Sequence, residues 1–427
     1  MKNEKIKSAI TCDLDGKIIT YAKGAEKIFG YKAEEVIGKM RVSDFSHGEV
    51  VLGHVINWLD IAVKEGEWEG DTVFLDKENN EMPCHIKITP TMDQDGNHNG
   101  FMGITSRLKD KSADDVRLNI SFGTKIFKWM VIMRLPFLSA TFVPIFAGAA
   151  VASMLGFPVS WPWLGLTLLA GSLLHIGTNT SNDFFDHQSG TDEINYNYSN
   201  QGLNGGSRSI QMGLISPKGM AKVAMVTFAL SAIVGVPLII KSGISILWLG
   251  VTGFLSGLFY TAPPFKFSSR KGMGELLIGL NFGPLMVAGS ALVQTGQLLP
   301  EAFLAGIPIG LLIAAVVYMN EFPDHDSDKQ TGKNTLIVVL GPEKARAGYV
   351  ALIASAFVSI VVMALNGIFP MLTLITLIAA YFGISATTTL YRHYNSRLLQ
   401  PANWGTIYLH SAVGFLFCLG IWLGTPV

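Results

Sequence analysis

The chain has 427 residues with 32 basic and 32 acidic side chains, so its formal charge is zero. Hydrophobic residues make up 49% of it and charged residues only 15%, against roughly 25% in an average soluble protein. The charges are unevenly divided: residues 1–120 hold 16 Lys and Arg and 21 Asp and Glu, whereas the longer remainder holds 16 and 11. This predicts a soluble domain followed by a membrane domain, and excludes a disordered chain, a collagen-like repeat and a disulfide scaffold. Because the three cysteines are far apart and no dense basic tract occurs, neither a zinc site nor a nucleic-acid partner is expected.

The N-terminal domain, residues 1–108, is predicted to be α+β. Asp15-Gly16 is a turn dipeptide between two strand-like runs, which is typical of a β-hairpin. The remaining predicted elements are helices over residues 25–31 and 33–38 and strands over residues 67–76, 82–90 and 99–106. The chain starts without the apolar segment of a signal peptide, so we expect this domain to lie in the cytoplasm.

Residues 109–128 are polar with scattered apolar positions, and they predict a connecting helix that leads to a membrane domain over residues 129–427. Intervals without Asp, Glu, Lys or Arg divide that domain into residues 135–182, 223–240, 242–265, 276–300, 302–320, 347–391 and 398–427. A helix needs about 20 apolar residues to cross a membrane. Two intervals are long enough for two helices each, with breaks near Gly156-Phe157-Pro158 and Asn366-Gly367. Since alternating strand patterns are missing, the sequence predicts an all-α bundle of nine transmembrane helices.

Basic residues predict the orientation of these helices. With the N-terminus inside, 15 Lys and Arg residues of the membrane domain and its connector lie on inner segments, and only Lys241 lies outside. We therefore expect a multi-pass protein of the inner (cytoplasmic) membrane, with Val427 outside.

Acidic residues of the membrane domain gather at the inner ends of the second and sixth predicted helices. The clusters share the pattern Asn-[Asp/Glu]-Phe-x-Asp-His-x-Ser, which indicates an internal duplication. Asp183 and Asp186 are three residues apart, and Asp324 and Asp328 are four apart. On continuous helices, the two members of each pair would lie on one face.

Carboxylates at this spacing repel one another, and a charge at the centre of a membrane costs roughly 2.5–3.5 kcal/mol on insertion scales. A hard divalent cation reverses that repulsion. Mg²⁺ suits carboxylates, keeps several waters and takes further ligands from substrate phosphates. Two facing clusters therefore predict Mg²⁺ held together with a diphosphate. The alternative is that these acids are solvated and merely cap helix ends.

Complementary cations follow the acidic clusters. Arg208 ends a Gly-Gly-Ser-Arg turn, Lys266 follows Tyr260-Thr-Ala-Pro-Pro-Phe, and Lys333 follows the second cluster. Arginine can bind phosphate oxygens in a forked geometry, and lysine supplies a point charge. The alternative is ordinary membrane anchoring, which we favour for Lys344, Arg346, Arg392 and Arg397.

These motifs resemble the UbiA superfamily of intramembrane prenyltransferases over roughly residues 125–425. The resemblance rests on two aspartate-rich motifs and a tyrosine–lysine signature between them: Asn182-Asp183-x-x-Asp186, Asp324-x-x-x-Asp328 with Gly332-Lys333, and Tyr260 with Lys266. Within the superfamily, Ser189-Gly-Thr-Asp192 and Gly283-Pro-Leu-Met286 are most similar to the branch that prenylates 1,4-dihydroxy-2-naphthoate for menaquinone. Glu321-Phe-Pro323 and Asn195-Tyr-Asn-Tyr198 depart from that branch.

The resemblance implies transfer of a polyprenyl group from an isoprenyl diphosphate to an aromatic acceptor within membrane lipid, with Mg²⁺ as cofactor. The implied catalytic residues are Asp183, Asp186, Asp324, Asp328, Tyr260 and Lys266, with the four aspartates as metal ligands. The implied substrate-binding residues are Asn179, Asn182, Arg208, Lys266, Asn320 and Lys333.

The N-terminal domain resembles a PAS sensor domain. The resemblance rests on Phe29-Gly30-Tyr31, on Gly66-x-Trp68-x-Gly70 and on the ending Gly103-Ile-Thr-Ser-Arg107. It leaves ligand sensing and dimerisation open, although the sequence lacks the Asn-Cys motif of flavin adducts. We expect this domain to regulate the membrane domain through the connector.

Three alternatives remain open at this point. The acceptor could instead be 4-hydroxybenzoate, homogentisate or a glycerol-lipid phosphate. A cation-coupled transporter also carries repeats and intramembrane acids, although its charges lie near the membrane midplane. A sensor that uses its helices only as anchors needs neither nine spans nor two acidic motifs.

Overall fold

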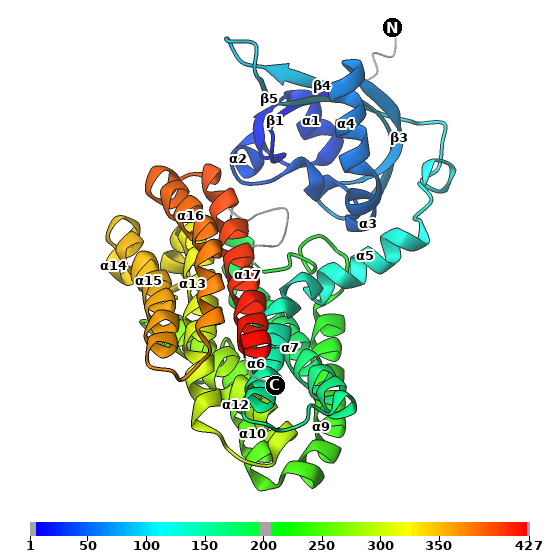
Figure 1. Ribbon diagram of the computed structural model, residues 1–427. Coiled ribbons are helices and arrows are strands. Elements are labelled where there is room, and N and C mark those ends of the chain that lie inside the picture. Colours follow the sequence, from blue (N-terminus) through cyan, green and yellow to red (C-terminus); the bar gives the residue numbers. More distant parts are fainter. Residues whose placement is uncertain (1–5, 196–205, 425–427) are drawn as a thin grey trace, which may run out of the picture. The chain divides into compact units, whose positions relative to one another are not determined.

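The computed structural model describes residues 6–195 and 206–424, in two compact units. One unit contains residues 1–132 together with the short segment Arg208–Ser216, and the other contains residues 133–207 and 217–427 (Figure 1). Five residues of the motifs and the terminus discussed above lie outside the described residues: Tyr196, Asn197, Tyr198, Gly205 and Val427.

The first unit is built on a five-stranded antiparallel sheet with the order β2-β1-β5-β4-β3. Its strands are β1 (Lys7–Asp13), β2 (Ile18–Tyr21), β3 (Trp68–Leu75), β4 (Glu81–Met92) and β5 (His98–Arg107). The predicted hairpin and the three later strands are confirmed. Alternating burial along β1 explains the pattern, because every second side chain faces the domain core.

Helices fill the connection between β2 and β3. They are α1 (Lys23–Phe29), α2 (Ala33–Val36), η1 (Val42–Phe45), α3 (Gly48–Val50), η2 (Val51–Val55) and α4 (Ile56–Glu65). The ring of Phe29 stacks on Phe45 at 4.5 Å, and Trp58 of α4 stacks on Trp68 of β3 at 4.4 Å. The first pair joins α1 to η1, and the second fixes α4 against the sheet. The sequence predicted α1 and α2 but not α4.

The chain leaves the sheet through η3 (Asp114–Val116) and the helix α5 (Phe122–Ile132). Arg117 binds Glu81 of β4 through two hydrogen bonds, at 3.1 and 2.6 Å. Helix α5 begins 13 residues after the start of the expected connecting helix and ends four residues after its end.

The second unit is entirely helical. It contains η4 (Leu135–Leu138), α6 (Ser139–Met154), α7 (Trp161–Ser189), α8 (Thr191–Ile194), α9 (Pro217–Ser242), α10 (Ile244–Leu258), η5 (Phe267–Ser269), α11 (Met273–Leu280), η6 (Asn281–Leu285), α12 (Met286–Thr295), α13 (Pro300–Thr331), α14 (Leu336–Leu340), α15 (Pro342–Leu365), η7 (Met371–Ala379), α16 (Ala380–His393), η8 (Arg397–Leu399) and α17 (Gln400–Gly424). The predicted breaks near Gly156 and Asn366 are confirmed, because α6 ends at Met154 and α15 at Leu365.

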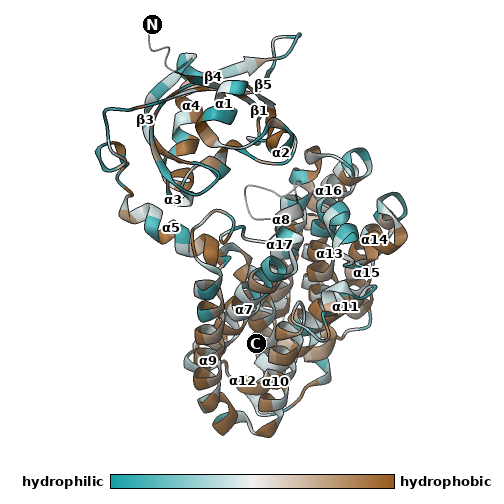
Figure 2. Ribbon diagram, turned by 180° about the vertical axis from the view of Figure 1, so that it is seen from behind, coloured by the Kyte–Doolittle hydropathy of each residue, from teal (hydrophilic) through white to brown (hydrophobic). Residues whose placement is uncertain are grey.

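Within the described residues, seven helices are long and apolar enough to cross a membrane. They are Leu135–Met154, Pro217–Ser242, Met273–Thr295, Pro300–Thr331, Pro342–Leu365, Met371–His393 and Gln400–Gly424. Helix α10 is apolar but shorter, with 15 residues. Hydrophobic residues run along most of α9 and α12 in Figure 2. The structure therefore supports a multi-span helical domain, whereas the predicted number of nine is not established by these helices.

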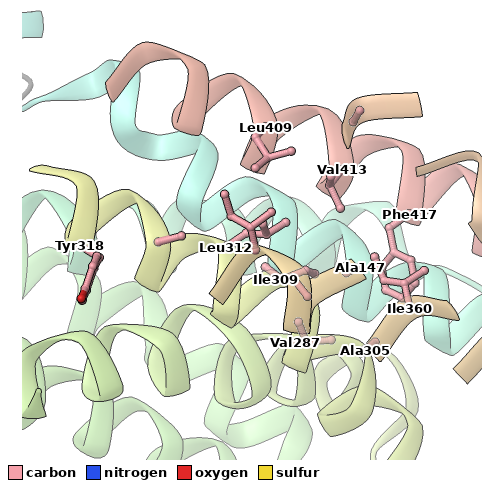
Figure 3. Packing of buried hydrophobic residues seen from close by; sticks show 14 of the residues in the cluster. Ala147, Val287, Ala305, Ile309, Leu312, Tyr318, Ile360, Leu409, Val413 and Phe417 are labelled. Atoms are coloured by element: carbon pink, nitrogen blue, oxygen red, sulfur yellow. The ribbon is translucent and has the colours of Figure 1, made fainter. Parts of the chain in front are cut away.

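Helix α13 forms the centre of this unit. Ile309 and Leu312 of α13 belong to a buried cluster with Leu409, Val413 and Phe417 of α17, which point toward α13 (Figure 3). On another side, glycines allow main chains to touch: a Cβ atom at Gly310 would collide with the carbonyl oxygen of Gly279 in α11. Small residues at crossings are typical of membrane helix packing.

Candidate active site

The first acidic cluster lies at the end of α7, which continues without a break through Asp183 and Asp186. The helix ends at Gly190, which adopts the left-handed conformation (φ 76°) that a glycine C-cap allows. Asp192 follows in α8 and is buried. Helical continuity places the two α7 aspartates on one face, as the sequence predicted.

The second cluster lies at the end of α13, which continues through Asp324 and Asp328 despite Pro323. This helix also ends at a left-handed glycine, Gly332 (φ 74°). The chain then turns back, and the amide of Lys333 donates a hydrogen bond to the carbonyl oxygen of Asp328 at 2.8 Å. The two motifs therefore share their local structure as well as their sequence.

Both clusters line one cavity of about 260 Å³ in the helical unit. The polar lining residues include Arg134, Asn179, Asn182, Asp183, Asp186, Asp192, Asn195, Tyr260, Asn320, Glu321, Asp324, Asp328 and Lys333. The side-chain amide of Asn195, which follows α8, donates a hydrogen bond to Oδ1 of Asp324 at 2.8 Å. The two acidic motifs thus line the same cavity, and the chain that follows the first motif contacts the second.

Asp183 is buried and has two partners on one carboxylate oxygen. The amide of Ser207 donates to its Oδ1 at 3.2 Å, and Nη1 of Arg134 lies 3.7 Å from the same atom. Gly206 (φ 72°) lies so close that a Cβ atom there would be 2.8 Å from Oδ1. Among the described residues, no donor lies within hydrogen-bond distance of Oδ2. That oxygen is buried without a hydrogen-bond partner in the described part of the chain, a cost that a cation bound beside it would relieve.

Arg134 is a residue of this site that the sequence analysis assigned only to membrane orientation. It stands at the start of the first apolar interval in a left-handed conformation (φ 52°), and its guanidinium lies 4.9 Å from the ring centre of Phe137. The only sequence signal was an isolated arginine directly before an apolar interval of 48 residues, 135–182.

The predicted cations have different positions. Lys333 lines the cavity with its Nζ 3.7 Å from Oδ1 of Asp328. Lys266 is exposed in the loop after α10 and is not among the described residues that line the cavity, whereas Tyr260 of the same signature is. Arg208 belongs to the unit that contains the N-terminal domain. The structure therefore brings one of the three predicted cations into the cavity wall.

The predicted asparagines also line the cavity, and two of them are fixed by neighbours. Oδ1 of Asn182 accepts a hydrogen bond from the hydroxyl of Thr261 at 2.9 Å, and Oδ1 of Asn320 accepts one from the amide of Asn403 at 2.8 Å. Asn179 is the third. Fixed amides of this kind can orient a bound polar group.

The far wall of the cavity is largely apolar. It includes Leu174, Phe282, Ile313 and Val316. His175 also lines the cavity, and its Nδ1 is hydrogen-bonded to the hydroxyl of Thr141 at 2.8 Å. A polar mouth joined to an apolar wall suits an amphipathic ligand.

The carboxylates of the cavity wall suit Mg²⁺, which shares its coordination with water and substrate, better than a metal whose ligands all come from the protein. Among the described residues, no group of three or more His, Cys, Asp or Glu side chains could hold a metal alone. The cavity wall nevertheless has six carboxyl groups against two cationic side chains, and Oδ2 of Asp183 is unpartnered among the described residues. Mg²⁺ is usually bound by one or two carboxylates, waters and substrate phosphates. The carboxylates present are therefore sufficient.

Comparison with known proteins identifies the helical unit. Residues 141–420, about two thirds of the chain, match the UbiA prenyltransferase family. The chain belongs to this family. It is 27% identical to the 1,4-dihydroxy-2-naphthoate octaprenyltransferase of Escherichia coli over 311 residues, which cover 69% of this chain and 95% of the relative. It is 30% identical to the enzyme of that name from Haemophilus influenzae over 243 residues, which cover 54% and 75%.

A solved UbiA homologue from Aeropyrum pernix has 17% identity and a TM-score of 0.51, and the match covers 64% of this chain and 96% of that one. This similarity concerns the fold. Membership of the UbiA family identifies the protein as a prenyltransferase and favours the enzymatic reading over a transporter or an anchored sensor.

The N-terminal unit contains a PAS domain, which matches residues 7–106. Three histidines of this unit are hydrogen-bonded to protein groups. Nε2 of His47 lies 2.9 Å from Oε1 of Glu81, Nε2 of His54 lies 3.1 Å from the main-chain oxygen of Asn119, and Nδ1 of His85 lies 2.7 Å from Oδ1 of Asp71. Burial raises the pKa of Cys84 to about 12, so this thiol is protonated at neutral pH.

Proposed function

We propose that this UbiA-family prenyltransferase transfers a polyprenyl group from an isoprenyl diphosphate to an aromatic acceptor resembling 1,4-dihydroxy-2-naphthoate. The observation that carries the proposal is that two aspartate-rich helix ends line one cavity, where Asn195 donates a hydrogen bond to Asp324. The named relatives support the acceptor class.

Bound Mg²⁺ would supply electrophilic stabilisation of the departing diphosphate. In this proposal Asp183, Asp186, Asp324 and Asp328 hold the metal ions. Lys333 lies beside the last of these and supplies positive charge to diphosphate oxygens, and Asn182 and Asn320 orient the head group. Groups that are fixed in advance in this way stabilise developing charge most strongly where water is excluded.

The apolar wall would hold the prenyl chain near its reacting carbon. The allylic C–O bond breaks, diphosphate leaves, and the ring carbon of the acceptor forms the new C–C bond. A naphthoate acceptor then loses its carboxylate as CO₂, whereas an acceptor without a carboxylate at that carbon loses a proton. Exclusion of water by Phe282, Ile313 and Val316 would keep the allylic cation from hydrolysis.

We also propose that α7 and α10 complete a set of nine membrane spans with the seven long apolar helices, which would place the PAS domain on the cytoplasmic side and Val427 outside. The support is the sequence, in which 15 basic residues lie on inner segments against one outside. The PAS domain would then sense a cytoplasmic signal and regulate transfer.

The test is an assay of membranes that contain the protein, with radiolabelled prenyl diphosphate and a panel of acceptors, with and without Mg²⁺. We expect labelled prenyl-naphthoate product that depends on Mg²⁺. Product with 4-hydroxybenzoate, homogentisate or a glycerol-lipid phosphate instead would correct the acceptor, and no labelled lipid with any acceptor would contradict the proposal.

A further inference from the structure

The PAS unit contains a chain segment that is distant in sequence from the PAS domain, Arg208–Ser216. This segment folds on itself: the amides of Met212 and Leu214 donate to the oxygens of Arg208 and Ser209, at 2.8 and 2.9 Å. It packs on Gly48, the first residue of α3. A Cβ atom at Gly48 would collide with the main-chain oxygen of Met212 and would lie 2.8 Å from Cδ2 of Leu214. The side chain of Leu214 is buried.

An attraction between Arg208 and Asp44 also holds this segment to the PAS unit. Burial raises the pKa of Asp44, and the nearby charges of Arg208 and Arg41 oppose that rise. Arg208 is therefore close enough to Asp44 to attract its carboxylate. The segment is held both by an apolar contact and by a charge.

Glu49, the next residue of α3, holds a second segment, the helix α5. Oε1 of Glu49 accepts a hydrogen bond from Nζ of Lys128 in α5 at 2.7 Å. One turn further, Gly53 lies against Thr124 of α5, where a Cβ atom would be 2.9 Å from the threonine hydroxyl. Two adjacent residues of the PAS domain thus fix α5 and the segment Arg208–Ser216.

Each of these segments continues directly to a partner of Asp183. Helix α5 ends two residues before Arg134, whose guanidinium lies 3.7 Å from Oδ1 of Asp183. The other segment begins one residue after Ser207, whose amide donates to the same Oδ1. Because consecutive Cα atoms are about 3.8 Å apart, each segment is tied to its Asp183 partner by no more than two such steps, so a large movement of the segment pulls on that partner.

We propose that the α3 turn of the PAS domain, residues 47–50, is a docking surface for the enzyme's own segment Arg208–Ser216, and that this docking, with the hold on α5, keeps Ser207 and Arg134 on Asp183. The inference rests on the proposed function, in which Asp183 holds the metal ion. A signal that rearranges α3 would release both segments and misplace the carboxylate. The PAS domain therefore acts on transfer through two segments of the chain: the connector with α5, and the segment Arg208–Ser216.

The test compares Gly48→Ala with Gly103→Ala in the full chain. A methyl group at Gly48 collides with the docked segment, whereas at Gly103 its nearest neighbour would be Ile86 Cδ1, at an ordinary contact distance of 3.6 Å. We expect Gly48→Ala to accelerate amide hydrogen exchange over residues 209–216, with unchanged exchange in β4 and β5. Prenyl transfer should fall by about ten- to a hundred-fold, as misplaced catalytic groups do. Gly103→Ala should change neither.

A charge exchange tests the second route. Glu49→Lys should reduce transfer, and the double variant Glu49→Lys with Lys128→Glu should restore it. Faster exchange over residues 209–216 in Gly48→Ala with unchanged transfer would overturn the coupling. Unchanged exchange there would overturn the docking contact. If the unsubstituted protein transfers no prenyl group to any acceptor, the proposed function fails, while the exchange measurement still decides whether the segment docks.

Discussion

Replacement of Asp183 by asparagine separates a metal-binding role from a structural one. The substitution preserves the shape of the side chain, and the new amide oxygen can still accept the hydrogen bond from Ser207. It removes the charge that Arg134 faces at 3.7 Å, an attraction of about 4 kcal/mol at an effective dielectric constant of 20. Burial of the carboxylate costs several kcal/mol in the opposite direction. The substitution also leaves the largely buried Arg134 without its counter-charge, so we expect the metal-free protein to lose about 1–3 kcal/mol of stability.

Activity should respond much more strongly. Loss of one preorganised electrostatic group costs about 2.7–4 kcal/mol of transition-state stabilisation, which corresponds to a fall of about a hundred- to a thousand-fold in transfer rate. The assay is product formation from radiolabelled prenyl diphosphate, paired with thermal unfolding in detergent at increasing Mg²⁺. Mg²⁺ at a hundred times its Kd would stabilise the unsubstituted protein by about 2.7 kcal/mol, and this gain should shrink in Asp183→Asn.

Asp326→Asn is the matched control, because this side chain belongs to the equivalent acidic motif on α13 but is exposed and pairs with His325 at 2.8 Å. We expect it to retain both activity and stabilisation by Mg²⁺. A fall of less than about ten-fold in Asp183→Asn, with stabilisation by Mg²⁺ intact, would refute the metal-binding role. An equal loss in both variants would show that any charge on these helix ends suffices.

Three further predictions concern the metal, the helix packing and the PAS core. Chelation by EDTA should abolish transfer and added Mg²⁺ should restore it, with unchanged helical circular dichroism; full activity after chelation would contradict the assignment. Gly310→Ala should destabilise the helical unit by about 1–3 kcal/mol in denaturant titration because it forces α13 away from Gly279, whereas Gly165→Ala, which faces open space, should be neutral or stabilising. Because its pKa is raised from 9.0 to about 12, Cys84 should react with iodoacetamide at pH 8 about a thousand-fold more slowly in the folded protein than in the unfolded chain; equal labelling by mass spectrometry would show that the thiol is accessible.

Much of the acidic site could be predicted from sequence because its signal is local and repeated. A carboxylate spacing of three or four on a continuous helix fixes a shared face, and a duplicated motif predicts two similar helix ends. Both helices do end at a left-handed glycine directly after the motif, Gly190 and Gly332. The apolar intervals predicted helix positions for the same reason, since each break contains residues that end a helix.

The remaining features depend on contacts between distant segments, which no local pattern contains. Arg134 and Ser207 meet at Asp183 although 49 and 24 residues separate them from it. Asn195 belonged to a stretch that the sequence analysis treated as a departure from the family, yet it lines the cavity and donates a hydrogen bond to Asp324 of the second motif. Helix α4, which packs on β3 through the contact of Trp58 with Trp68, was missed although its own sequence is amphipathic.

The charge of the cavity implies an order of events. Its described lining has six carboxyl groups and two cationic side chains, Arg134 and Lys333, each already within 4 Å of a carboxylate. An isoprenyl diphosphate brings several further negative charges, so it would be repelled from this wall unless cations enter before it or with it. Mg²⁺ should therefore govern binding as well as chemistry.

Binding of a labelled prenyl diphosphate should then require Mg²⁺ even when the acceptor is omitted. The apparent affinity for the diphosphate should rise with the concentration of Mg²⁺, and the apparent affinity for Mg²⁺ with that of the diphosphate, because linkage makes such coupling reciprocal. Tight diphosphate binding after chelation would show that the lysine and arginine suffice to hold it.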